Sequence, residues 1–371
     1  MNDQTPPPSP AFELQPSRFE RLRGRLRSPH LGRPHVGRPH LRRPGRRALG
    51  PGMALYLLSP LIAEMCSGAT PWYSYIFFGW MLCLMYGGGA ILIRETTLRW
   101  GKGWPTILAL GVAYAIAEEG IAVRTFFDPA GAAKGLGPYG WLGGVNWVWV
   151  TEMALYHAII SIAIPIFLVM LAYPARRNEP WVSARWLKKA TIGYVGVIAF
   201  WLVFYKLPVQ GIYIIACLAA IAALVRLARR LPASIQIAPG SGAAPTPRRV
   251  VLACFGSAAG VFVLSFTRGL GLSPLDGVLG MIALAAVPGW WLMRSSARPG
   301  WTDRHRYAVA AGVLFSLVAL SPIMELVGQH GQVVVGIVFA WLMRRTWRRL
   351  RARETVAETA PVSLEGSPEA A

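Results

Sequence analysis

Apolar runs of roughly 20 residues recur along the chain, and each is long enough to cross a lipid bilayer as a helix. They begin at residue 52 and end at residue 346. Hydrophobic residues make up 54% of the 371 residues, and charged residues make up only 15%. A soluble domain seldom has this balance. The sequence therefore predicts an all-α protein, a polytopic bundle of transmembrane helices in a lipid bilayer.

The apolar runs divide into ten predicted spans. Their expected limits are residues 52–68, 73–94, 104–127, 146–173, 190–206, 208–226, 249–267, 274–293, 307–327 and 331–346. Together they form one membrane domain, residues 51–346, with possible halves at 51–230 and 249–346 that are joined by a linker at 231–248. An Arg-, Pro- and His-rich tail at 1–50 and a basic, then acidic, tail at 347–371 are expected to be disordered.

The net charge of +21 comes mostly from arginines in the tails and in alternate loops. The loops between them carry few basic residues, namely Lys134, Lys206 and Arg268. Because basic residues favour the cytoplasmic side, we expect both termini to lie in the cytoplasm, beneath a bacterial-type cytoplasmic (inner) membrane. The basic tails and loops are expected to contact anionic lipid headgroups. No nucleic-acid partner is expected, since orientation in the membrane accounts for the charge.

The third predicted span carries Glu118 and Glu119 near its middle and Arg124 near its end. Charged groups at such depth are costly, which indicates a functional site. His157 reaches a similar depth in the next span, so it is the expected partner of these acids. Successive helix residues diverge by about 100°, so we expect only one glutamate to face His157. The other is then expected to pair with Arg124 or with another helix. The alternative is that these polar groups only fix helix packing.

Further polar side chains are expected to line a cavity. Asn146 and Ser161 share a helical face with His157, whereas Glu152 points elsewhere. Two similar pieces, LSPLIAEM and LSPIMELV, place one glutamate each near the outer ends of the first and ninth spans. The complete set of cavity-lining candidates is Glu64, Asn146, Glu152, Ser161, Glu325 and His330.

A glutamate pair, a downstream arginine and a histidine one helix later resemble the CPBP family of intramembrane CAAX-processing and bacteriocin-processing-like proteases. The resemblance covers residues 104–174. In the family pattern Glu-Glu-x-x-x-Arg three residues precede the arginine, whereas four separate Glu119 from Arg124 here. In the pattern Phe-x-x-x-His, Met153 stands in place of phenylalanine before His157. The resemblance implies that a glutamate activates water and that histidine helps to bind a divalent metal or to stabilise the reaction intermediate.

These features leave three classes of function open. A transporter or permease would use Glu118, Glu119 and His157 to handle a proton, a cation or a small solute. A CPBP-like metalloprotease or hydrolase would use the same residues, with Arg124, for catalysis. A non-catalytic component of a membrane assembly would need neither activity. Whether the chain is an enzyme is therefore left open, and a divalent metal is the one cofactor implied, only in the CPBP-like case.

Overall fold

The structure, a computed structural model, describes residues 49–131, 136–205, 207, 209–235, 238 and 240–359. Within them, eight helices are long and apolar enough to cross a membrane: Trp72–Arg99, Trp104–Ala122, Trp147–Ala172, Ala184–Phe204, Gly211–Arg230, Pro247–Phe266, Pro274–Ser296 and Asp303–Leu326. A shorter apolar helix, Pro51–Cys66, precedes them, and α12 (Gln332–Thr359) follows. Strands are limited to β1 (Trp141–Leu142) and β2 (Val145–Asn146) in the part described. The all-α, multi-pass prediction is confirmed.

The first four helices are each built from several segments. In the first, α1 (Pro51–Pro60) continues as a π-helix, η2 (Leu61–Cys66). In the second, η3 (Trp72–Ser74) and α2 (Tyr75–Leu82) lead through the π-helix η4 (Cys83–Gly87) into α3 (Gly88–Arg99). The third joins α4 (Trp104–Ala115) to the π-helix η5 (Ile116–Ala122), and the fourth places η8 (Tyr156–Ala163) between α5 (Trp147–Leu155) and α6 (Ile164–Ala172).

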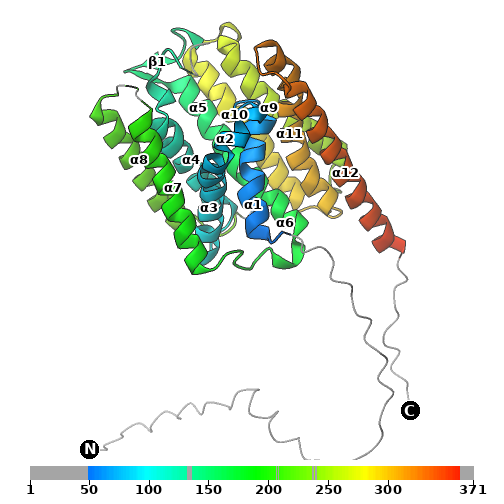
Figure 1. The fold of residues 1–371 in the computed structure, drawn as a ribbon. Helices are drawn as coiled ribbons and strands as arrows, with labels where there is room; N and C mark the ends of the chain where they lie inside the picture. The colour runs from blue at the N-terminus through cyan, green and yellow to red at the C-terminus, as the bar shows by residue number, and fades with distance from the viewer. Residues whose placement is uncertain are drawn as a thin grey trace, which may run out of the picture. The chain divides into compact units, whose positions relative to one another are not determined.

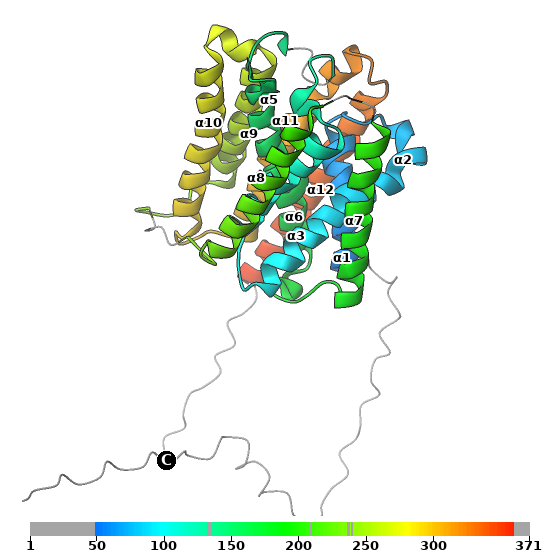
Figure 2. The same cartoon turned by 90° about the vertical axis from the view of Figure 1, so that its left-hand side faces the viewer.

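The later helices are regular: α7 (Ala184–Phe204), α8 (Gly211–Arg230), α9 (Pro247–Phe266), α10 (Pro274–Ser296) and α11 (Asp303–Leu326). Helix α7 packs against α3 and α8 packs against α4, and in Figure 1 α9 to α12 form the other side of the bundle. In Figure 2, α9 and α10 lie at the edge opposite α7. The segmented helices are mostly buried, whereas α7, α8 and α10 expose most of their apolar surface. This burial pattern makes the segmented helices the core of the bundle, and lipid is the solvent for the exposed apolar faces.

Two predicted limits differ from the structure. The third span was expected to reach Phe127, but its helix ends at Ala122 because Arg124 has a left-handed backbone, with φ 56°. The tail expected at 347–371 starts as helix, since α12 continues to Thr359. The predicted tail at 1–50 lies outside the described residues except for Leu49 and Gly50, as do residues 360–371.

The basic loops are tied together at one end of the bundle. Lys102, between α3 and α4, donates to the Leu231 carbonyl oxygen at the end of α8 (2.7 Å). Arg177, after α6, pairs with Asp303 at the start of α11 (3.3 Å). These contacts join loops that are far apart in the sequence. Consecutive helices run in alternate directions across the bundle (Figure 1).

The first two helices approach each other closely beside the centre of the bundle. A Cβ atom added to Gly87 in η4 would lie 2.2 Å from the Tyr56 carbonyl oxygen of α1. Only glycine allows this approach, because a backbone oxygen cannot rotate away as a side chain can. The neighbouring residue, Tyr86, is thereby held between α1 and the third helix, where it is almost fully buried.

Candidate functional site

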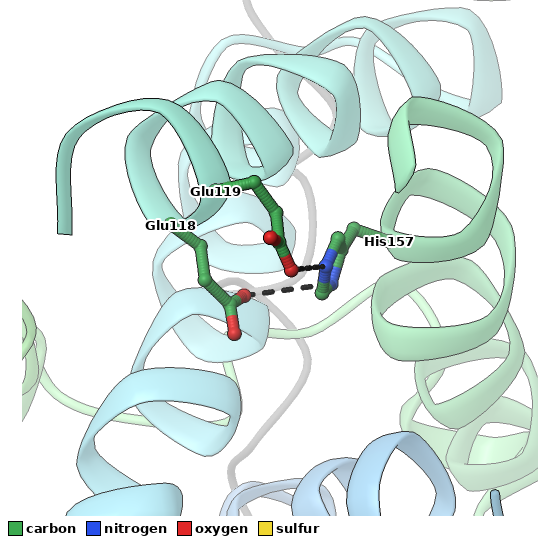
Figure 3. A group of neighbouring side chains, drawn as sticks. All are labelled: Glu118, Glu119 and His157. Carbon is green, nitrogen blue, oxygen red and sulfur yellow. Dashed lines mark hydrogen bonds and ion pairs between the residues drawn. The ribbon is translucent and has the colours of Figure 1, made fainter. Parts of the chain in front are cut away.

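His157 lies between the carboxylates of Glu118 and Glu119 at the centre of the bundle (Figure 3). Its Nε2 is 3.1 Å from Glu119 Oε1, and its Nδ1 is 3.4 Å from Glu118 Oε2. The exposed fractions are 2% for Glu118, 8% for Glu119 and 2% for His157. Both carboxylates therefore face one imidazole, which differs from the expectation that only one of them would.

The π-helical segment η5 explains how neighbouring glutamates reach the same ring. A π-helix closes its hydrogen bonds over five residues instead of four, so it turns less per residue than an α-helix. Glu118 and Glu119 consequently diverge less, and they meet the ring at its two different nitrogens. Expecting the angle of a regular α-helix between them was wrong for this segment.

Each of the four segmented helices contributes to the site from its π-helical part. Glu64 lies in η2, Tyr86 in η4, the glutamate pair in η5 and His157 in η8. Such segments are rare and occur frequently at functional sites. Their coincidence here indicates that the helices are locally distorted to bring these polar side chains together.

Tyr86 connects a third carboxylate to the site. Its hydroxyl is within hydrogen-bond reach of Glu64 Oε1 and of Glu118 Oε1. Thr70 also donates to Glu64, over 2.6 Å. A phenol has one proton, so it can donate to only one of the two carboxylates. The other contact requires a carboxyl group that carries a proton itself.

Two hydroxyl groups and one indole hold the Glu119 carboxylate and the His157 ring in place. Thr125 donates to Glu119 Oε2, and the Trp149 indole N–H donates to the Thr125 hydroxyl oxygen (3.0 Å). Ser161 Oγ lies 3.1 Å from His157 Nδ1. Sequence reasoning missed Thr125 and Trp149, as well as Tyr86. In the sequence, nothing distinguishes them from other buried or interfacial residues that carry an aromatic ring or a hydroxyl group.

Aromatic rings surround the imidazole, which is 2% exposed. The ring centroids of Tyr86, Tyr114 and Tyr156 lie 6.1, 5.7 and 5.3 Å from that of His157. Electrostatic interactions are stronger in such a low-dielectric setting than in water. The geometry therefore couples the charge states of Glu118, Glu119 and His157 strongly.

Arg124 does not pair with either glutamate. Its left-handed backbone takes the chain out of the helix, and its side chain lies beside the Tyr205 ring at the end of α7, with the guanidinium carbon 5.9 Å from the ring centroid. The side chain is 8% exposed, and its Nε and Nη2 atoms have no hydrogen-bond partner among the described residues. The expected ion pair with Glu118 or Glu119 is therefore absent from the described part of the chain.

The remaining candidates divide between the site and other places. Glu64 and Ser161 belong to the site. Asn146 instead caps α5 by accepting from the Trp149 backbone N–H (3.0 Å). Glu325 accepts from the backbone N–H groups of Gly331 (3.0 Å) and Val333 (3.1 Å) at the turn before α12.

His330 lies beside Glu325, with His330 Nδ1 3.9 Å from Glu325 Oε1, and its side chain is 84% exposed. Glu152 points away from His157, as expected, and binds Ser265 of α9. The structure thus separates Glu325, His330, Asn146 and Glu152 from the central site.

The central group also has the donors that a metal ion would need. One ligand atom from each of Glu118, Glu119 and His157 can be chosen so that all lie within 4.8 Å of one another. Two carboxylates and one imidazole are ligands that divalent ions such as zinc accept in proteins. The arrangement is therefore suited to either protons or a divalent cation.

A comparison with protein-family models finds a match over residues 53–360, which is most of the chain and includes every residue of the central site. The matching model describes an uncharacterized membrane protein family. The chain belongs to this family. Membership agrees with the multi-pass architecture and makes the protein an integral membrane protein. No curated protein and no solved structure matches the chain.

Proposed function

We propose that this membrane protein handles protons or small cations, as a transporter or permease does, through the buried network of Glu64, Tyr86, Glu118, His157 and Glu119. The observation that carries the proposal is the single Tyr86 hydroxyl between two carboxylates. One phenol proton does not serve both contacts, so the network holds at least one exchangeable carboxyl proton. A chain of protonatable groups at this depth is typical of proton relays in transport proteins.

The network also provides a path rather than a single binding group. From Glu64 it passes through Tyr86 to Glu118, and from there to His157 and Glu119. Four different helices supply these groups, so a relative movement of the helices would break and reform its contacts. That property supports transport better than it supports a purely structural role, in which a fixed and fully satisfied set of hydrogen bonds is favoured.

Proton movement is expected in vesicles that contain the purified protein. With a potassium diffusion potential applied, a lumenal pH dye should report proton entry at least about tenfold faster than with Glu118→Gln, since a neutral amide cannot carry the proton. Glu325→Gln is the matched control and should behave like the parent, because Glu325 lies outside the network. Parent vesicles that are no more permeable than protein-free vesicles would contradict the proposal.

A second candidate, metal-dependent hydrolysis of the CPBP-like kind, is favoured by the ligand geometry. Glu118, Glu119 and His157 would hold the metal, and a bound divalent ion would supply a water molecule activated at neutral pH. Elemental analysis of protein purified without chelators tests this. We expect one divalent metal ion per chain, lost in His157→Gln, if the second candidate is correct. Metal-free parent protein would leave the proton-handling proposal as the better one.

The orientation in the membrane is part of the proposal. We place the basic end of the bundle, and with it both termini, on the cytoplasmic side of a bacterial-type cytoplasmic membrane, where anionic headgroups attract arginine. A green fluorescent protein fused to the C-terminus is then expected to fluoresce. A dark but stably inserted fusion would place that end outside.

A further inference from the structure

Glu152 lies on the helix of His157 but faces a different part of the bundle. It is 1% exposed. Its Oε2 accepts a hydrogen bond from the Ser265 hydroxyl of α9, whereas its Oε1 has no partner among the described residues. A buried carboxylate oxygen without a donor is costly, so its position suggests that something else supplies the missing contact.

A cavity of about 50 Å³ adjoins this carboxyl group. Helices α5, α9, α10 and α11, together with η8, form its walls, and its lining includes Glu152, Tyr156, Ser257, Phe262, Ala285 and Val313. Glu152 is the only charged residue in the lining. Ser257 donates its hydroxyl proton to the Leu284 carbonyl oxygen (2.6 Å), so that proton is not available to Glu152.

The residues that line the cavity limit which ions it could bind. Calcium and magnesium ions require about six or more oxygen ligands, which one carboxylate in an apolar cavity does not provide. An ammonium group needs fewer oxygen ligands, since its N–H groups donate to a carboxylate and its charge is attracted to aromatic faces. Tyr156 and Phe262 supply such rings, with centroids 6.3 Å apart. The cavity has room for a small ion, since a single water molecule needs only about 10–15 Å³ by the same measure of volume.

We propose that this cavity binds a small ammonium ion, either ammonium itself or methylammonium, with Glu152 as its counter-charge. The site is separate from the proton-handling network, because the Tyr156 ring stands between the cavity and His157. The Tyr156 hydroxyl is held by the Ala63 carbonyl oxygen, which keeps that ring in place. Ammonium binding here does not depend on the proposed proton movement, and either can fail without the other.

Equilibrium binding of radiolabelled methylammonium to the purified full-length protein tests the proposal. The parent is expected to bind one ion per chain in a saturable manner. Glu152→Gln should bind at least about tenfold more weakly, because a hydrogen bond to a charged group is replaced by one to a neutral amide. Tetramethylammonium should compete poorly, since it has no N–H group to donate to Glu152.

A second variant keeps the test independent of Glu152 itself. Ala285→Leu fills the cavity from α10 and leaves the carboxyl group in place, so it should also weaken binding about tenfold or more. Glu325→Gln, which removes a carboxylate far from the cavity lining, should bind like the parent. Size-exclusion chromatography shows which variants fold, and Ala285→Leu decides if Glu152→Gln does not. Absence of saturable binding by the parent, or parent-like binding by a folded Glu152→Gln or Ala285→Leu, would overturn the proposal.

Discussion

Replacing His157 with leucine is expected to lower the free energy of unfolding by about 3–5 kcal/mol at neutral pH, the cost of removing one partner from a buried ion pair. Leucine is similar in size to histidine, so the loss is electrostatic rather than a loss of packing. Glu118 and Glu119 would face each other without the imidazole between them. Unfolding by a denaturing detergent in mixed micelles measures the change.

A triple variant, Glu118→Gln, Glu119→Gln and His157→Leu, serves as the control. Replacing all the members of a buried ion pair or triad with neutral groups costs less than removing one member alone. The triple variant should therefore be more stable than His157→Leu alone, an interaction energy that mutational cycles measure. Strictly additive losses would show that the three residues act independently, contrary to the geometry in Figure 3.

Replacing Glu95 with alanine is the second change with a large expected effect, also about 3–5 kcal/mol of unfolding free energy. Glu95 is 1% exposed near the basic end of α3. It pairs with Arg94 and Arg99 and accepts from the Trp181 backbone N–H (2.9 Å). The alanine variant would leave the Arg94 guanidinium, which is 4% exposed and lies 3.8 Å from the Trp181 ring centroid, without its counter-charge.

An exposed ion pair nearby provides the matched control for Glu95. Glu179 pairs with Arg176 over 3.2 Å, but both side chains are largely exposed, at 59% and 43%. Such pairs contribute about 0–1 kcal/mol, so Glu179→Ala should unfold almost like the parent in the same denaturation experiment. If Glu95→Ala and Glu179→Ala lowered the free energy of unfolding by the same small amount, the buried ion pairs of Glu95 would not stabilise the basic end of the bundle.

Much of the architecture could be predicted from composition along the chain. Hydropathy is summed over a bilayer's thickness, so a run of apolar residues indicates a spanning helix whatever its neighbours are. The eight long apolar helices overlap eight of the ten predicted spans, and the first and last predicted spans overlap Pro51–Cys66 and α12. The depth of a residue in the membrane follows from the number of residues between it and the end of its span. His157 could therefore be predicted from the sequence to lie at the depth of Glu118 and Glu119.

What the tertiary structure decided was rotation, register and local distortion. The π-helical turn that aims Glu118 and Glu119 at one ring has no periodic signal in the sequence, because the residues around it are almost uniformly apolar. The contact of Tyr86 with both Glu64 and Glu118 depends on how the first three helices slide and turn against one another. In lipid the rotation and sliding of the helices are set by interhelical packing and not by the burial of an apolar stripe. Hydropathy alone therefore does not determine them.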